Sequence, residues 1–503
     1  MTDRRRYLAA VGATLTGGVA GCIALENRAF LADPDEGAAG VQERVDTASE
    51  HVTDGGATET DRAPIVTLPA GTYRWDRSLE VPGGVTVRAA DDVAPTDIVF
   101  AVPDDHDLTA YPAPHDGEVM TAVTNASHAD EPAGPETDAG ELDLESDVHL
   151  SEYTIEFAGD SEPVPEDRFF AGIWLDGVTA SSVERVFVHD VVPHARDRDE
   201  RAYGVLVSNC LPPVAEDDGS PDVGDAVTVR TCLITRAGYE GIGVRGHNSH
   251  VLVADSETRA CDTHGIQIST WTHGHLGRYY GYPRHVTVSD CRCEQTIIHH
   301  GRHHGEAAVG DGPEDHFDHD VRIERCESDQ GIRLWERTSG TVVADCAGQL
   351  RAVARDDEWH EAVTVTGHTA ATAETGTRDL PIECDARGDR ARYDDVTIRE
   401  TEVAADALLS VFESTGEFDD VTVGRVILAD VVLTPPTGGD RASAIVRVRD
   451  GIVVDELRIR NVTAEVARIV DGVDGGRVRT LRSDGEIDID AGDVEEVVID
   501  SGA

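Results

Sequence analysis

The residues best suited to chemistry recur directly in front of a glycine that opens a short apolar segment. Five successive segments supply, at this position, Tyr203, Glu240, His264, His304 and Gln330. If each segment is a strand in the next layer of a stack, neighbouring layers lie about 4.8 Å apart and these side chains form one polar column. A column with a carboxylate, imidazoles and a phenol could bind a ligand and move a proton.

The same segments place more polar and aromatic residues on the outer face that carries the column. Three positions further on come Gly243, Gln267 and Arg333, with Ala308 four positions after His304, and two beyond these come Arg245, Ser269, Gly310 and Trp335. Aromatic rings offer flat apolar surface to sugar CH groups, and Arg binds carboxylates through two parallel hydrogen bonds. The mixture favours a sugar chain as ligand, bound by Tyr203, His304, Trp335 and the loop residue Tyr279. The alternative is a solvated polar strip, because every stack must expose polar residues.

These positions depend on a six-residue repeat that recurs in one register. It occurs at 186–191, 227–232, 251–256, 286–291, 321–326 and 341–346. Two apolar residues alternate with polar ones, as a strand with one buried face requires, and a corner residue, often Asp, precedes a small Cys, Ser or Val. Such units cannot bury their apolar face alone, so they must stack into a solenoid.

Each unit also has a second strand introduced by glycine, as in Gly241-Ile-Gly-Val and Gly265-Ile-Gln-Ile, and the first unit starts at Pro64-Ile-Val-Thr-Leu-Pro-Ala-Gly-Thr-Tyr73. This pattern resembles the right-handed parallel β-helix of the pectin-lyase-like superfamily over residues 63–495. The resemblance implies an all-β solenoid. It does not imply one activity, because a fold hosts many functions and the site decides between them.

In the β-helical polysaccharide lyases that this fold resembles, a basic side chain removes the proton beside a uronate carboxylate, and a cation or Arg neutralises that carboxylate. All 43 basic residues of the chain are Arg, so lysine cannot be the base. We therefore expect His264 to accept the proton, because an imidazole titrates near neutral pH. Arg245 and Arg333 would hold the carboxylate, and Tyr279 or Tyr280 would protonate the leaving oxygen.

A glycoside hydrolase is a second possibility, and it needs two carboxylates across the glycosidic bond. The polygalacturonase-like members of the superfamily pair Asn-Thr-Asp with Asp-Asp, Gly-His-Gly and Arg-x-Lys segments. This chain has Thr263-His-Gly265 but lacks the Asn-Thr-Asp and Arg-x-Lys segments, so only Glu240 with Asp262 remains as an acid pair. A third possibility is a non-catalytic surface protein that binds glycans or other proteins.

The composition is strongly acidic, with 97 Asp and Glu, no Lys and a net charge of -54 over 503 residues. Such charge on a repeat sequence is typical of adaptation to molar salt, where self-repulsion is screened. An acidic disordered chain is disfavoured because 40% of the residues are apolar and lie in register. Nucleic acid and anionic membrane surfaces are therefore excluded as expected partners.

The N-terminus predicts export and anchoring. Arg4-Arg5-Arg6-Tyr7-Leu8, a mildly apolar run and Ala20-Gly21-Cys22 resemble a twin-arginine signal that ends in a lipobox, with Cys22 lipidated at the cell surface. We then expect an acidic tether at 23–62, a β-helix at 63–495 with an acidic insertion at about 103–145, and a C-terminal tail at 496–503.

The positions of the cysteines and of the longer insertions also predict structural features. Cys232, Cys291, Cys326 and Cys346 fall at the inward position of the repeat and predict a buried ladder, whereas four others lie off it and could pair in an exported protein. Longer insertions at 209–225, 270–284 and 310–319 fall at one corner and predict a walled groove. The Asp- and His-rich run at 310–320 makes calcium a possible ligand without matching a defined motif.

Overall fold

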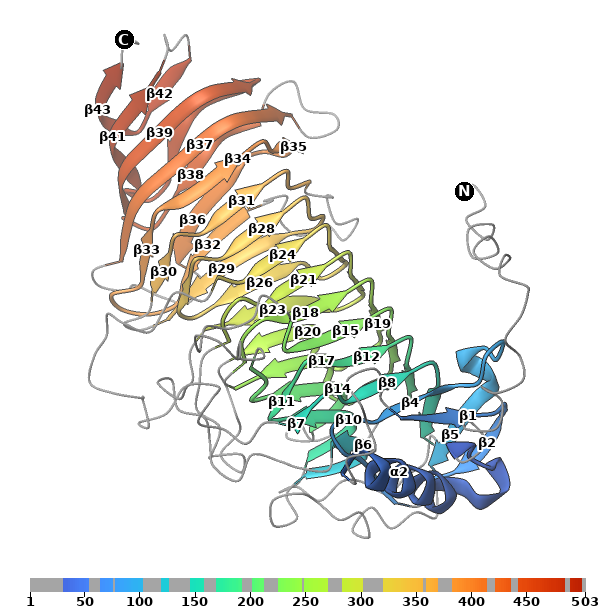
Figure 1. Cartoon of the computed structure of the whole chain (residues 1–503). Coiled ribbons are helices and arrows are strands. Elements are labelled where there is room, and N and C mark those ends of the chain that lie inside the picture. The colour runs from blue at the N-terminus through green and yellow to red at the C-terminus, as the bar shows by residue number, and fades with distance from the viewer. Residues whose placement is uncertain are drawn as a thin grey trace, which may run out of the picture.

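The computed structural model of the chain describes residues 30–53, 64–75, 77–102, 119–125, 145–157, 169–191, 201–211, 225–246, 248–269, 283–301, 320–355, 359–369, 382–413, 421–435, 442–484 and 489–499. All the strand pairings among these residues are parallel, and each turn of the chain passes from one sheet to another before it returns to the first. The chain therefore winds into a parallel β-helix, whose strands stack along one long axis (Figure 1).

Within the described residues, the largest sheet has 19 strands. They are β1 (Ile65–Leu68), β4 (Thr86–Ala89), β8 (His149–Ser151), β12 (Ser181–Glu184), β15 (Val227–Arg230), β18 (Val251–Ala254), β21 (Thr287–Ser289), β24 (Arg322–Glu324), β27 (Thr338–Ser339), β28 (Val342–Ala344), β30 (Trp359–Glu361), β31 (Thr364–Thr366), β33 (Arg392–Asp394), β34 (Val396–Arg399), β35 (Glu402–Ala404), β37 (Thr422–Thr434), β39 (Val453–Ala464), β41 (Arg477–Ser483) and β43 (Val494–Ile499). We call it the first sheet, and it contains most of the six-residue repeats.

The second sheet has 14 described strands and contains the segments introduced by glycine. They are β3 (Leu79–Val81), β6 (Val119–Asn125), β10 (Phe169–Asp176), β14 (Arg201–Ser208), β17 (Glu240–Arg245), β20 (His264–Ser269), β23 (Thr296–His300), β26 (Ile332–Trp335), β29 (Leu350–Ala354), β32 (Ile382–Ala386), β36 (Leu409–Glu413), β38 (Ala442–Val448), β40 (Val466–Gly472) and β42 (Asp490–Gly492).

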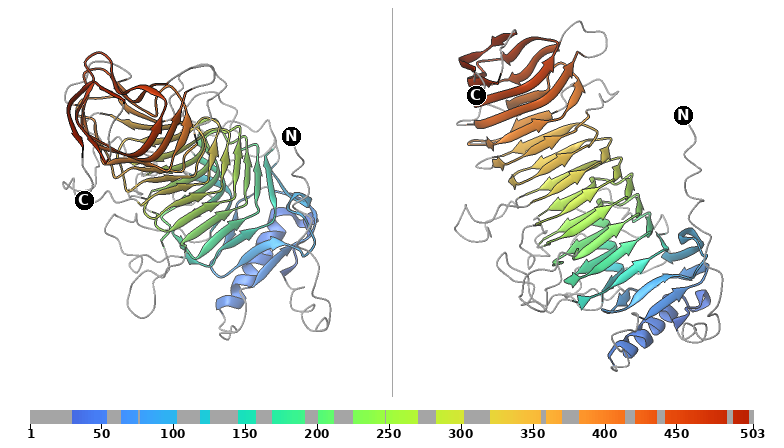
Figure 2. Two further views of the ribbon diagram at one scale, coloured as in Figure 1. Left: turned by 90° about the horizontal axis from the view of Figure 1, so that it is seen from above. Right: turned by 45° about the horizontal axis from the view of Figure 1, so that its top comes forward.

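A third sheet of eight described strands closes the helix only in its N-terminal part. Its strands are β2 (Gly71–Arg74), β5 (Ile98–Val102), β9 (Thr154–Phe157), β13 (Phe187–His189), β16 (Leu233–Thr235), β19 (Glu257–Arg259), β22 (Arg292–Cys293) and β25 (Glu327–Ser328), and β7 (Glu145–Ser146) pairs separately with β11 (Val178–Thr179). Beyond β25 the turns widen into longer strands such as β37 and β39, which is visible at the red end in Figure 2.

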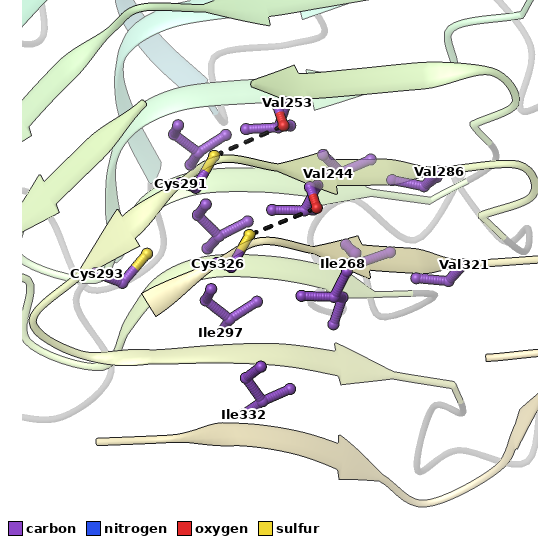
Figure 3. Packing of buried hydrophobic residues seen from close by; sticks show 14 of the residues in the cluster. Val244, Val253, Ile268, Val286, Cys291, Cys293, Ile297, Val321, Cys326 and Ile332 are labelled. Carbon is purple, nitrogen blue, oxygen red and sulfur yellow. Dashed lines mark hydrogen bonds between the residues drawn. The ribbon is translucent and has the colours of Figure 1, made fainter. Parts of the chain in front are cut away.

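The six-residue repeat folds as its alternation predicts. Val288 and Ile323 are register partners on β21 and β24, and both are fully buried. The small residue after each corner points inward, so Cys291 and Cys326 lie one above the other in the core (Figure 3). The backbone N–H of Cys326 donates to the Sγ of Cys346 at 3.4 Å, which continues the ladder by one turn. The predicted cysteine ladder is confirmed.

The corner residue of the repeat adopts a left-handed backbone conformation. Asp255, Asp290 and Asp345 have φ values of 50°, 55° and 52°. Asp, like Asn, tolerates this region better than most residues because its short side chain can hydrogen-bond locally. The preference for Asp at this position is therefore explained by the backbone of the corner.

A helix covers the N-terminal end of the core, in a segment that we expected to be an extended tether. After η2 (Pro34–Glu36), α2 (Gly37–Thr53) packs against β1, β2 and β3, and its apolar side chains are buried: Ala38, Val41, Val45 and Ala48. Their spacing of three and four residues puts them on one face of a helix. The tether prediction is therefore wrong for residues 34–53. The only other described helix is the short η3 (Pro95–Asp97).

The C-terminal end has no such cover among the described residues. Val497 and Ile499 on β43 are 46% and 52% exposed, although Val497 continues the inward row of the fully buried Leu481. Strand β43 also extends to Ile499, so residues 496–499 belong to the β-helix and not to a tail.

All eight cysteines after Cys22 are described, buried and free, so the expected pairing of some of them into disulfides is not observed. No helix in the described part of the chain is long and apolar enough to cross a membrane. Cys22, most of the 103–145 insertion and nearly all residues of the three long corner insertions lie outside the described residues.

Candidate functional site

The outer face of the second sheet gathers the predicted site residues because two consecutive residues of strands such as β17 point inward. A Cβ on Gly241 would lie 2.7 Å from the side chain of Thr258 inside the helix, and the next residue, Ile242, is also fully buried. A Cβ on Gly243 would instead lie 2.9 Å from the Oε2 of Glu240 on the outer side. Two consecutive inward residues therefore put both Glu240 and Arg245 on the outer face.

The register places His264 between Glu240 on β17 and Thr296 on β23. We expected His304 beside His264, but the strand after β20 is Thr296–His300, so Thr296 takes that position in the column. His304 itself lies outside the described residues, as does Tyr279.

Glu240 and Arg245 form a buried ion pair that does not face solvent. Their side chains are 0% and 2% exposed, and Nε and Nη2 of Arg245 both donate to the carboxylate, the former at 3.1 Å. The guanidinium also lies over the rings of Tyr203 and Tyr239, 5.2 and 5.4 Å from their centroids. Glu240 raises the pKa of Arg245 against the opposing effect of burial, so the pair stays charged and satisfied.

This pairing overturns three of the expected roles. Tyr203 is 1% exposed and packs in an apolar cluster on the outer face, with Ala171, Trp174 and Leu206, so it cannot offer its ring to a sugar. Glu240 and Arg245 are occupied by one another, so neither is placed to act as a general acid or to clamp a substrate carboxylate. All three residues are packed within the face of the sheet.

His264 remains half-buried on the outer face. Its Nδ1 lies 2.6 Å from the Oγ1 of Thr296. Burial is the main cause that lowers the pKa of His264 to about 3, and the positive charges of Arg333 and Arg245 lower it further. At neutral pH His264 is therefore an uncharged imidazole.

An arginine cluster lies further along the same face. Arg333 on β26 and Arg351 on β29 are register partners, and Arg351 donates to Asp385 on β32 at 2.5 Å. Arg387 shares the same carboxylate oxygen of Asp385 at 2.8 Å, and Arg351 is 3.4 Å from Glu383. Both carboxylates are buried, which holds the arginines in place.

Arg333 differs from its neighbours because it forms no ion pair within the described part of the chain. Its side chain is half-buried, and its pKa is lowered by burial first and then by Arg351 and Arg387. Since Arg351 and Arg387 are paired with carboxylates, Arg333 is the guanidinium of this cluster that can bind an anion.

Trp335 was expected to stack on a sugar ring, but arginines lie over its ring. The guanidinium groups of Arg355 and Arg387 lie 5.0 and 5.2 Å from its ring centroid. Its indole N–H donates to Glu336 at 3.0 Å, and Glu336 also contacts Nε2 of His300 at 2.8 Å. Trp335 therefore orders the arginine cluster rather than offering an open platform.

No group of three or more His, Cys, Asp and Glu side chains among the described residues is arranged to hold a metal ion. The expected calcium ligands at 311–319 lie outside those residues, as do the insertions that were expected to wall a groove. The metal and groove predictions therefore stay predictions.

Sequence reasoning found His264, Arg333 and Trp335 on this face but missed the arginine cluster. Arg351 was available in the sequence as the one polar residue of β29, and Glu383 and Asp385 as polar residues two apart in β32. They escaped notice because neither strand is introduced by glycine.

Comparison with known proteins gives no family. No family model matches the chain, and no curated protein matches it. Solved structures match at low similarity. The catalytic domain of a GH87 α-1,3-glucanase in complex with tetrasaccharides has 10% identity and a TM-score of 0.42 over 84% of this chain and 64% of that chain. This chain thus spans just under two thirds of that structure's length.

Two further solved structures are similar to this chain to about the same degree. The catalytic unit of a thermostable GH87 α-1,3-glucanase from Streptomyces thermodiastaticus has 12% identity and a TM-score of 0.38, over 97% of this chain and 70% of that chain. A tailspike protein of the Escherichia coli bacteriophage HK620 in complex with a hexasaccharide has 10% identity and a TM-score of 0.47, over 93% and 75%. At these identities no site residue can be assigned by correspondence, so the function is argued from this chain's own residues.

Proposed function

We propose that the outer face of the second sheet binds an acidic polysaccharide and that the protein cleaves it by lyase-like elimination at a uronate. The observation that carries this proposal is Arg333, a half-buried guanidinium without an ion pair within the described residues, next to Arg351 and Arg387. A carboxylate bound there would relieve the repulsion among the three cations and would gain charge-assisted hydrogen bonds.

Elimination needs a base and a cation that neutralises the carboxylate beside the proton to be removed. Arg333 would be that cation. His264 would be the base, because it is uncharged at neutral pH and lies close enough to Arg333 for the cation to lower its pKa. A carboxylate on Arg333 removes part of that positive field, so substrate binding would raise the pKa of His264 and make it a stronger base.

The second candidate function is glycan binding without catalysis. It is favoured by the ion pair between Glu240 and Arg245. Glu240 is the register partner of His264 in the preceding turn, but its carboxylate is bound to Arg245 and cannot serve as the acid of a catalytic pair. Both candidates require Arg333, and only the lyase requires His264.

The test uses the whole chain in molar salt with a panel of uronate polymers and a neutral glucan. Binding is measured by calorimetry, and unsaturated products by ultraviolet absorbance. We expect Arg333→Gln to weaken uronate binding about tenfold or more, since a hydrogen bond to a charged group contributes roughly 1.5–3 kcal/mol. Arg399→Gln, at an exposed position of the first sheet, is the matched control and should change nothing.

His264→Gln should abolish product formation while uronate binding persists. Binding of uronates without any unsaturated product, in the wild type and the variant alike, would assign the non-catalytic role. Equal binding by Arg333→Gln and the wild type would refute the site.

We also propose that the protein is exported through the twin-arginine route and anchored at the cell surface by a lipid on Cys22, in a salt-loving organism. The support is the sequence of the first 22 residues and the acidic composition. Expression with Cys22→Ser should release the protein from the membrane fraction, whereas an unchanged distribution would exclude the lipid anchor.

A further inference from the structure

Two histidines lie side by side at a corner of the helix that the proposed function does not use. His250 and His285 directly precede two six-residue repeats in successive turns, and their ring centroids are 4.6 Å apart. Asp320 occupies the same corner in the next turn, and its Oδ2 lies 2.9 Å from the Nδ1 of His285. The three side chains thus form a short column at the start of the repeats.

Among the described residues, no other turn places a histidine at this corner. His250, His285 and Asp320 have φ values of 58°, 51° and 41°, in the left-handed region. The same position is occupied in other turns by Ala180, Gly340, Ala362, Asp147 and Asp395, also at positive φ. Among the described residues, two imidazoles in adjacent turns therefore occur only in this part of the column, at a backbone conformation that strains most residues.

The hydrogen bonds fix which nitrogen of each ring stays available. Nδ1 of His250 lies 2.8 Å from the Oγ of Ser249, and Nδ1 of His285 is held by Asp320. Neither Nε2 atom has a hydrogen-bond partner within the described residues, and the side chain of His285 is 47% exposed. Metal-binding histidines in proteins are held in this way, by an oxygen on the nitrogen that does not bind the metal.

We propose that His250 and His285 form a two-histidine site for a divalent transition-metal ion such as Ni²⁺, Cu²⁺ or Zn²⁺, bound through the two Nε2 atoms. Water completes the coordination, because no third protein donor of the described residues converges on the pair. Imidazole nitrogens suit these ions, whereas Ca²⁺ and Mg²⁺ prefer oxygen ligands. The bound ion would connect two successive turns of the helix.

The experiment titrates Ni²⁺ or Zn²⁺ into the metal-free full chain and follows binding by calorimetry. His250→Asn and His285→Asn remove one ligand each and keep a residue that tolerates a positive φ. His149→Asn is the control, since the Nδ1 of His149 also contacts a serine hydroxyl, at 3.0 Å, but no second imidazole is recorded beside it among the described residues. Circular dichroism establishes that each variant is folded.

We expect one equivalent of metal to bind the wild type and the His149→Asn variant alike, and to bind either corner variant at least tenfold more weakly. Electron paramagnetic resonance of the Cu²⁺ complex should show two nitrogen ligands in the wild type and one in each corner variant. Unchanged affinity in the doubly substituted protein would place the metal on histidines outside the described residues and overturn the proposal. The absence of saturable binding in the wild type would overturn it as well.

Discussion

Removing the charge of Glu240 tests whether the ion pair on the second sheet is structural. In Glu240→Gln the buried Arg245 loses the carboxylate that balances it, while the size of the side chain is kept. Two unit charges about 4 Å apart attract by about 4 kcal/mol at an effective dielectric constant near 20. Breaking a buried pair from one side costs about 3–5 kcal/mol, because a charge remains buried. We therefore expect the free energy of unfolding to fall by about 4 kcal/mol.

The assay is a double-mutant cycle in molar salt, with unfolding by denaturant followed by circular dichroism. Glu240→Leu and Arg245→Met should each cost a similar amount, and the variant with both substitutions should be destabilised by much less than the sum of the two single losses. Uronate binding per folded molecule should be unchanged in Glu240→Gln. Additive losses, or a loss below about 1 kcal/mol in each single variant, would refute the assignment of a coupled buried pair.

Three further outcomes follow from the same structure. Cys326→Ala should lower the free energy of unfolding by about 1–2 kcal/mol through a cavity in the cysteine ladder, and a loss near zero would mean that the ladder is loosely packed. Burial lowers the pKa of His360 to about 4, so the unfolded chain takes up this proton first and stability should fall by about 3 kcal/mol as the pH drops from 6.5 to 4; His360→Gln should flatten that slope in denaturant titrations, and an unaltered slope would contradict the assignment. Transfer from molar to tenth-molar salt should abolish the β signal in circular dichroism, because 97 acidic residues then repel one another, and full retention would show that the acidity does not serve stability.

The helical stack was predictable because its signals are local. The alternation around Val288 and the small Cys291 after a corner Asp are sufficient to set the inward face, and identical units must then stack. Helix α2 was missed because a segment rich in Gly, Ala and Glu has the composition of a linker. The three- and four-residue spacing of Ala38, Val41 and Val45 was the signal that could have revealed it.

The candidate site was less predictable because its geometry depends on long-range register. Alternation alone puts Glu240 and Arg245, five residues apart, on opposite faces of a strand, and only the two consecutive inward residues Gly241 and Ile242 bring them together. The position of Thr296 beside His264 likewise depends on which part of the 292–310 segment enters the sheet. Neither choice is encoded in residue types within a single turn, so contacts made between turns could not be derived from composition or spacing.

The left-handed corners have an evolutionary consequence. A single residue such as Asp290 or Asp345 bends the chain out of the first sheet, and the row Val288, Ile323 and Val343 stays in register although the connections between these strands differ in length. Insertions and deletions at the corners are therefore absorbed without a shift of the neighbouring turns. A lineage can lengthen, shorten or exchange corner segments, and so change what the surface recognises, while the core remains a fixed scaffold that tolerates little variation of its own.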